Sequence, residues 1–355
     1  MSYSQKLLAL CQTHDLHMLL PNIETKLIAY RQDNLTVMTS ITDEVVSNVY
    51  VVSPYALMID YGEEELEKIK VPLEKGFFFV LVKFFSLVLK GIKIDRVQIL
   101  NNYLFSTNFF AKAWESLDVS LLRKDAIIAY PKYSLLIRSV NQLQNPKLYN
   151  TLINDGWKAI ALRQVYIYDD KEKWQKARNT KNDKKLLHSE QFNFVESTDY
   201  EMAITLYNSL YLDKYSQHNI HYTPTFLEHL VEQGLLKLFF MQDIKTKQHV
   251  GVVGVTEEEG VMTVPIIGYD KSYSQKDALY RRLVYYVTAY AFEQNALLNF
   301  SSGAPDFKTK RGAKPILEYM FVYDKHLSLP RRMVWQSIML LSKYLYAPML
   351  QRLKL

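Results

Sequence analysis

The order of apolar and polar positions in the first half of the chain predicts alternating helices and strands. Some segments repeat apolar residues at helical spacing, and others are short apolar runs between turn residues, which distinguishes helices from strands. The pattern predicts helices at 4–14, 77–89, 109–122 and 146–154, and strands at 26–31, 34–40, 46–52, 96–100, 133–138 and 160–168. Such a mixture is typical of the α/β class.

The second half has a clearer order. An apolar stripe predicts a helix at 198–214, and Pro224 and Gly234 mark the start and the end of the next helix. The pattern further predicts a long helix at 276–294 and strands at 191–195, 236–242, 249–256, 261–268, 297–300 and 317–323. Short polar turns join the three middle strands, so we expect those strands to be antiparallel.

A polar, strongly charged segment at 169–185 separates the two halves. Because few apolar residues there can join a core, it predicts a solvated linker and a domain boundary. A length of 355 residues also favours two domains. We therefore expect domains at 1–185 and 186–325, followed by a basic amphipathic tail at 326–355.

Two segments have unusual apolar patterns. The run Phe77–Leu89 is too short to span a membrane, so it predicts a buried helix or strand, with an interfacial helix as the alternative. The tail from Lys325 onward has six basic residues and no acidic one, which equals the whole net charge of +6. This composition suits a helix that lies on an anionic membrane, or one that packs on the body of the protein or on a partner.

The composition also limits the chemistry. Cys11 is the only cysteine, so an intramolecular disulfide and a cysteine-rich zinc site are excluded. The amino terminus lacks the pattern of a secretory signal, and we expect a cytoplasmic protein that can contact the inner membrane face through its tail. His218, His221 and His229 have a spacing that suggests metal, but no carboxylate complements them, so we expect no metal site.

The segment Asn295–Tyr323 holds the strongest functional signal. An apolar strand leads into Ser301, Ser302 and Gly303, and a cationic turn follows. This arrangement brings backbone donors and cations to an anionic or polarised ligand. The alternative is a charged surface loop. The cationic residues of the turn are Lys308, Lys310, Arg311 and Lys314.

Two polar features of the first half are further candidates. Asn102 belongs to a polar segment, 101–108, directly after a strand. Its amide either binds substrate or forms a turn. Arg138 ends an apolar strand and needs an anionic partner, either a structural carboxylate or a ligand.

The order of elements in the second half, with the glycine-ended loop and the pair Phe307–Lys308 before Gly312, resembles the GNAT superfamily of acyltransferases, and in particular its FemAB-like branch. The resemblance implies two tandem GNAT-like domains, each a mixed, mostly antiparallel sheet flanked by helices. It also implies transfer of an acyl or aminoacyl group to an amine. Between Gly268 and Gly303 the chain lacks the glycine-rich turn that binds the pyrophosphate of CoA.

We therefore expect no permanently bound cofactor, and a cosubstrate that is an acyl-CoA, an acyl carrier protein or an aminoacyl-tRNA. The resemblance implies that Lys308 and the backbone near Ser302 and Gly303 serve the oxyanion or the donor, with Arg311 as a second cation. Asp306 is a candidate base or a helix cap. The residues assigned to the donor are Ser301, Ser302, Gly303, Phe307, Lys310 and Arg311.

In GNAT-like folds the junction Leu206–Phe226 borders the acceptor groove. Tyr215 and His218 are its catalytic candidates, and the predicted substrate-binding residues are Tyr211, Lys214, Asn219 and Tyr222 with Asn102 and Arg138. The alternative is a helix end finished by Asn219 and a loop packed by tyrosines. Together these features predict an N-acyltransferase. The alternative is a catalytically silent module of the same fold that binds a lipid, a carrier protein or RNA.

Overall fold

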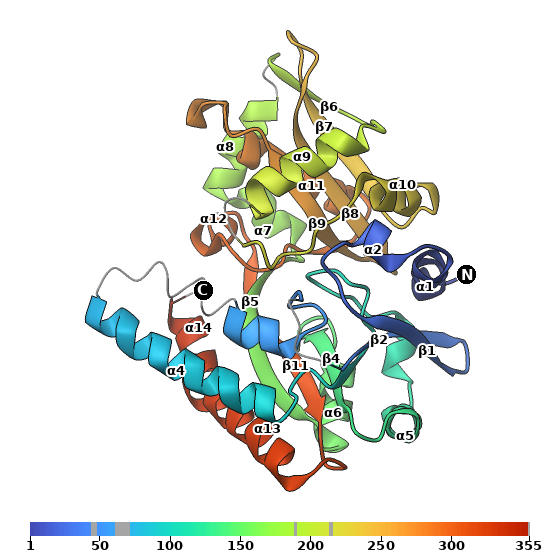
Figure 1. Cartoon of the computed structure of the whole chain (residues 1–355). Coiled ribbons are helices and arrows are strands. Elements are labelled where there is room, and N and C mark those ends of the chain that lie inside the picture. Colours follow the sequence, from blue (N-terminus) through green and yellow to red (C-terminus); the bar gives the residue numbers. More distant parts are fainter. Residues whose placement is uncertain (44–47, 61–71, 188–189, 213–215, 354–355) are drawn as a thin grey trace.

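The computed structural model describes residues 1–43, 48–60, 72–187, 190–212 and 216–353, with side chains for all of these except 72–81 and 353. Its strands form one continuous sheet in the order β1-β2-β3-β4-β11-β5-β10-β9-β8-β7-β6 (Figure 1). The strands are β1 Lys26–Gln32, β2 Leu35–Thr42, β3 Val97–Leu100, β4 Ser134–Val140, β5 Lys158–Tyr168, β6 Phe192–Val195, β7 Lys237–Asp243, β8 His249–Glu258, β9 Val261–Tyr269, β10 Leu297–Asn299 and β11 Lys314–Tyr323.

Helices cover both faces of this sheet, so the class is mixed α/β with a mostly antiparallel sheet, as predicted. The helices are α1 Tyr3–Thr13, α2 Leu16–Leu19, η1 Ala56–Asp60, α4 Pro72–Gly91, η2 Lys112–Glu115, α5 Val119–Ala129, α6 Pro146–Asn154, α7 Lys171–Lys176, α8 Arg178–Leu187, α9 Tyr200–Tyr211, α10 Pro224–Glu232, η3 Gln275–Asp277, α11 Leu279–Glu293, α12 Pro305–Thr309, α13 Leu329–Leu341, η4 Ser342–Tyr346 and α14 Ala347–Leu353.

The sheet contains the same unit twice. In the first copy β1, β2 and β3 are antiparallel, α5 follows, and β4 lies parallel to β3. In the second copy β7, β8 and β9 are antiparallel, α11 follows, and β10 lies parallel to β9. The last strands of the two copies, β5 and β11, change places. β5 follows the first copy in the chain but pairs with β10 of the second, and β11 follows the second copy but pairs with β4 of the first. β5 and β11 also pair with each other, which makes the sheet continuous.

Alternate residues of each strand enter cores on opposite faces of the sheet. In the second copy Phe240 packs with α9, α10 and α1, whereas Phe239 packs with α11. In the first copy Phe321 packs with α5 and α6, whereas Met320 packs with α4 and α13. The two faces are therefore both covered by helices.

The predicted solvated linker at 169–185 is wrong as a description of that segment. It forms α7 and α8, because Asp170 caps the first of these helices and their inner face is apolar or paired. Trp174 and Asp183 are buried there, and the charged residues that suggested a linker occupy the outer face. The predicted domain limits themselves stay a prediction.

Two other predicted elements differ. Of the strand expected at 46–52, residues 46 and 47 lie outside the described residues, and 48–52 form no strand but include a turn at 50–52 with Val51 and Val52 buried. The helix expected at 109–122 begins later, at Val119, because the Asp118 carboxylate accepts from the backbone N–H of Leu121 and caps α5 there.

The tail packs on the body of the protein through one face of α13. The indole of Trp335 is fully buried, and its Nε1 donates to the hydroxyl of Ser134 over 2.9 Å. The sequence predicted a buried element at 77–89. Within the described side chains of α4 this prediction is wrong, because Phe84 and Leu87 are exposed. None of the described helices is both long enough and apolar enough to cross a bilayer.

Candidate active site

Strands β9 and β10 separate after a short parallel contact. They pair only from Leu297↔Val261 to Asn299↔Thr263, after which β10 ends and β9 continues to Tyr269. Beyond Thr263 no described strand pairs with the β10-facing edge of β9. A β-bulge between β8 and β9 and Pro265 within β9 lie at this point, and both features are typical of places where a ladder is interrupted.

The loop that follows β10 remains attached to β5. The N–H of Phe300 donates to the carbonyl of Tyr166 over 2.9 Å, and the N–H of Tyr166 donates to the carbonyl of Ser301 over 3.0 Å. Ser301 and Gly303 have positive φ angles of 54° and 81°. A glycine adopts such an angle at little cost, so the sequence Ser-Ser-Gly permits this tight loop.

Lys308 holds the loop from inside. Its Nζ donates to the carbonyls of Phe300 and Ser302, each over 2.7 Å, and to that of Ser301 over 3.3 Å. The side chain is only 2% exposed. Burial, with a contribution from the guanidinium of Arg163, holds the pKa of Lys308 well below its usual value. Lys308 is therefore buried and is not a solvated residue of a charged surface loop, the alternative that the sequence left open.

This arrangement orients two backbone donors. In a trans peptide the C=O of one residue and the N–H of the next point in opposite directions. Since the carbonyls of Ser301 and Ser302 point to Lys308, the N–H groups of Ser302 and Gly303 point away from it, and Gly303 is exposed. Within the described residues these two N–H groups donate to no protein acceptor. Adjacent N–H groups of this kind form an anion-binding concavity.

Arg311 is not available as the predicted second cation. Its guanidinium binds the buried carboxylate of Asp183 over 2.5 Å and donates to the carbonyl of Phe307 over 3.0 Å. It also lies 3.5 Å from the centroid of the Phe307 ring. Asp183 binds Arg281 as well, over 2.6 Å. The charge of Arg311 is thus balanced inside the protein, because α8 supplies a carboxylate where a linker was expected.

Aromatic side chains bridge the separated strands. Tyr280 at the start of α11 contacts both Tyr269 at the end of β9 and Phe307 in α12, with ring centroids 6.1 Å and 5.0 Å apart. All three rings are half-buried. Asp306 is exposed and caps nothing, because the N-cap position of α12 is Ala304 and has no side-chain cap. The predicted cap is therefore wrong.

Lys310 is exposed beside a hollow of about 510 Å³ between α7 and the end of α12. The hollow has both signs of charge, because Asp170 and Glu172 face Lys173 and Lys176 there. It is therefore not a uniformly cationic surface.

The junction between α9 and α10 is largely a packed helix end. The amide of Asn219 donates to the carbonyl of Tyr211 over 2.8 Å, and Tyr222 is buried against Tyr207, Phe226 and Phe105. Burial holds the pKa of Tyr222 well above its usual value. Predicted groove lining by Tyr222 is therefore wrong, and the alternative, a helix end with packed tyrosines, is confirmed.

The other predicted residues of this junction have separate positions. Tyr211 stacks on Tyr207 with centroids 4.9 Å apart, and the backbone of His218 donates to the hydroxyl of Ser216. Lys214 and Tyr215 lie outside the described residues. Among the described residues, no hydrogen bond or ion pair that the structure shows joins His218 to the loop after β10.

Asn102 and Arg138 belong to the buried interior of the first copy. Asn102 donates to Val51 and Ser40, each over 2.8 Å, so its role is to form a turn, not to line a substrate site. Arg138 donates to the backbone carbonyls of Val51 and Ser106 instead of the predicted carboxylate. Burial lowers the pKa of Arg138 to about 10. In the described part of the first copy, the mostly buried segment 101–110 follows β3 at the place that corresponds to the β9–β10 separation.

Sequence reasoning missed two residues in the middle of the sheet. Arg163 of β5 binds the buried Glu318 of β11 over 2.8 Å, and its guanidinium also donates to the carbonyl of Ser106. An arginine and a glutamate within two otherwise apolar strands are a signal for such a pair. Pro265, inside a predicted strand, was the signal for the strand separation.

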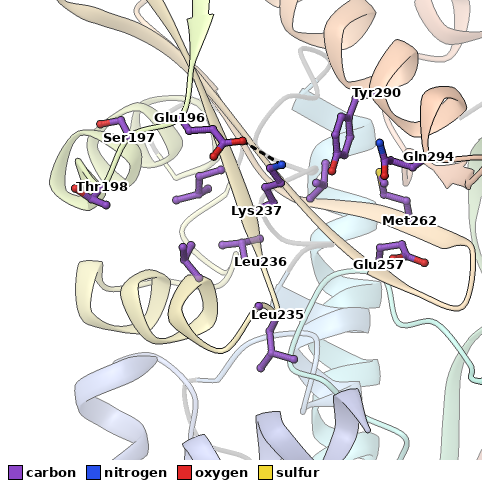
Figure 2. Close-up of a pocket in the computed structure, with 14 residues that line it drawn as sticks. Glu196, Ser197, Thr198, Leu235, Leu236, Lys237, Glu257, Met262, Tyr290 and Gln294 are labelled. Carbon is purple, nitrogen blue, oxygen red and sulfur yellow. Dashed lines mark ion pairs between the residues drawn. The ribbon is translucent and has the colours of Figure 1, made fainter. Parts of the chain in front are cut away.

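A second hollow lies at the opposite end of the second copy. A groove of about 720 Å³ there contains Lys237, which pairs with Glu196 over 3.0 Å. Figure 2 shows this pair with Tyr290 beside it. The groove includes Met262, at the start of β9, whereas the loop anchored by Lys308 lies beyond the end of β10. We therefore place the candidate active site at the loop, where donors converge, and not in the larger groove. Within the described residues no group of three His, Cys, Asp or Glu side chains forms a metal site.

The fold is that of FemX. The structure of FemX matches 95% of this chain and 98% of its own with a TM-score of 0.51 at 11% identity. L-PGS from Bacillus licheniformis matches 61% of this chain and 74% of its own, with a TM-score of 0.41 and 14% identity. A GCN5-related N-acetyltransferase from Kribbella flavida matches 64% and 80%, with a TM-score of 0.33 and 14% identity.

No family model and no curated protein sequence matches the chain. At the level of the fold, the predicted resemblance to the FemAB-like branch of the GNAT superfamily is confirmed.

Proposed function

We propose that this protein is an N-acyltransferase that moves an acyl or aminoacyl group from an activated carrier to an amine. One observation carries the proposal: Lys308 draws successive carbonyls inward, so that the N–H groups of Ser302 and Gly303 point outward beside the place where β9 and β10 separate. A FemX fold along almost the whole chain supports it.

The chemistry requires an amine to attack the carbonyl carbon of a thioester or ester. The carbonyl oxygen becomes anionic, and the two N–H groups stabilise that charge as an oxyanion hole. The C–S or C–O bond to the carrier then breaks, an amide is formed, and the amine proton leaves with the carrier or passes to water. No covalent intermediate with the protein is needed.

The unpaired edge of β9 from Val264 onward provides the means to hold the donor arm. An extended chain can add to such an edge through backbone hydrogen bonds. Tyr280 contacts Tyr269 at the end of that edge and Phe307 in α12, so aromatic side chains flank the place proposed for the donor. In this proposal Lys308 is a positioning residue, because it acts through the loop and does not touch the reacting atoms.

The donor is a thioester of CoA or of an acyl carrier protein, or it is an aminoacyl-tRNA. The last two are polyanions, which suits the exposed Lys310 and the basic tail. A second candidate function is a silent binding module of the same fold. The internal pairing of Arg311 with Asp183 favours it, since that charge is not available for catalysis.

Lys308→Met tests the proposal. Wild-type protein is assayed with an acyl-CoA, an acylated carrier protein and an aminoacyl-tRNA, and amine-dependent release of the carrier is measured. We expect one donor class to be turned over. In Lys308→Met the loop loses its inner anchor, so kcat falls by about 10²-fold while KM for the donor changes little. The control Lys124→Ala, at an exposed lysine of α5 outside the candidate site, keeps kcat.

Two outcomes would contradict the proposal. If Lys308→Met has an unchanged kcat with a native thermal transition, the oxyanion role of the loop is wrong. If the wild type binds a donor but turns over none of the three, the protein is the silent binding module.

A further inference from the structure

Helix α4 and the tail helices pack against each other, and each carries exposed apolar side chains. They meet in a shared core, where Leu89 of α4 packs with Trp335 and Ile338 of α13, and Figure 1 shows α4 beside the red tail helices. The outward side chains are large and apolar. On α4 they include Phe84 (62% exposed) and Leu87 (71%), and on the tail Met333 (61%), Leu341 (48%), Tyr344 (70%) and Leu345 (65%). We call these six residues and their surroundings the α4–tail face.

The tail is already docked on the body by its other side. Trp335 is fully buried, and the Ser342 hydroxyl accepts from the backbone N–H of Ala161 over 2.7 Å. The hydroxyl of Tyr346 donates to the carbonyl of Leu162 over 3.0 Å. The inner stripe of the tail is therefore used to pack on the body of the protein. The outer stripe is a separate feature, and contiguous exposed apolar patches of many large side chains mark interaction surfaces.

The described charged side chains of α4 and of the tail have one sign. Residues 82–91 and 325–355 contain no acidic residue, and the exposed cations there include Lys90, Arg332, Lys343 and Arg352. Apolar and aromatic residues with only basic neighbours are typical of helices that lie in the interface of an anionic membrane. A symmetric contact with a second copy would place like charges opposite each other.

We propose that the α4–tail face docks on the surface of an anionic lipid bilayer. Its apolar side chains enter the boundary between headgroups and acyl chains, and its lysines and arginines contact the phosphates. The helices lie on the membrane and do not span it. Because the tail packs directly on β5, the strand of Arg163 and Tyr166, docking holds the candidate active site close to the bilayer. The proposal does not depend on the transferase activity.

The test is vesicle flotation of the full chain with phosphatidylcholine vesicles that contain or lack phosphatidylglycerol. We expect binding to the anionic vesicles, weakened by salt. The double variant Leu341→Glu with Leu345→Glu removes apolar area and adds repulsion, and we expect it to lower the partition coefficient about tenfold or more. Deleting 331–355 is a poorer test, because it also removes the buried Trp335.

Ile128→Glu is the matched control, since Ile128 is 79% exposed on α5 and lies outside the face; it should bind as the wild type does. Thermal transitions of all variants show that they are folded. The proposal is overturned if folded wild type does not float with anionic vesicles, or if the double variant floats equally well. It is also overturned if the face instead mediates self-association, seen in light scattering as a dimer that the double variant abolishes.

Discussion

Gly268 of β9 touches the backbone of Leu206 in α9. A Cβ atom at residue 268 would lie 2.3 Å from both the carbonyl carbon and the carbonyl oxygen of Leu206. Backbone cannot move aside as a flexible side chain does, so only glycine allows α9 to rest on β9 at this distance. The contact fixes the helix next to the strand whose free edge belongs to the candidate active site.

We therefore predict that Gly268→Ala destabilises the protein strongly. The added methyl group forces α9 away from the sheet, and overpacking of a core costs about 1–3 kcal/mol, more where backbone must shift. Urea unfolding measures the change. Gly91→Ala is the control, because nothing lies within 4 Å of its Cβ position, and we expect nearly unchanged stability. Equal stability of the two variants would contradict the observed contact.

A second prediction concerns Asp183, which binds Arg311 over 2.5 Å and Arg281 over 2.6 Å. Asp183→Asn leaves the buried guanidinium of Arg311 without its counter-charge, and removing one partner of a buried pair costs about 3–5 kcal/mol. We expect a matching drop in the free energy of unfolding and release of α8, seen as faster proteolysis between residues 171 and 187.

The control for this prediction is Glu172→Gln on the neighbouring helix. Glu172 is 75% exposed and pairs with Lys176, so we expect a change within about 0.5 kcal/mol. If Asp183→Asn were equally mild, the charge of Arg311 would have another partner, and its assignment as a structural cation would be wrong.

A third prediction is a pH dependence. Burial raises the pKa of Glu258 from 4.5 to about 7. The native state then holds its proton in a window where the unfolded state has lost it, so stability falls as the pH rises from about 4.5 to 7. Glu258→Gln has no such titration. We therefore expect its free energy of unfolding, relative to that of the wild type, to rise by about 2 kcal/mol across that window. Melting temperatures at pH 5 and 7.5 measure the difference.

The exposed Glu228 provides the matched control, since Glu228→Gln should follow the wild type at both pH values. A gap between wild type and Glu258→Gln that is the same at pH 5 and pH 7.5 would contradict the raised pKa of Glu258.

Lys308 gives a fourth prediction with the opposite sign. Its pKa is well below 10.5 in the native state, so the unfolded state binds more protons between the native pKa and 10.5. The stability of the wild type relative to Lys308→Met should therefore rise as the pH rises through that window. Denaturation of both proteins at pH 7 and pH 9.5 measures it. A constant difference would mean that Lys308 titrates alike in both states.

Local sequence patterns predicted most strands and helices, because the periods of 2 and 3.6 reflect which face of an element is buried. The exchange of β5 and β11 was not predictable in this way, since pairing between residues as distant as Arg163 and Glu318 leaves no mark on either local period. The charged segment at 169–185 misled for a related reason. Its buried residues, Trp174, Thr180 and Asp183, are few, and the carboxylate of Asp183 is paired with the guanidinium of Arg311.

The place of the candidate site stays a prediction, whereas the geometry of its loop could not be predicted from the sequence. The small residues from Ser301 to Gly303 and the nearby cations pointed to the loop after β10, and the loop is indeed exposed at Gly303. The direction in which Lys308 points could not be predicted, because a lysine in a polar turn is equally compatible with solvent. Its three carbonyl partners depend on the positive φ angles of the loop, which sequence alone does not specify.

The exchanged strands also determine when the protein can finish folding on the ribosome. β4 has β3 on one side, but its other neighbour is β11, which is the last of the described strands in chain order. Until residues 314–323 emerge, the first half presents an open strand edge, and such edges invite pairing with other chains. We therefore expect nascent chains that end before β11 to require chaperones, although almost all of the apolar core has by then been made.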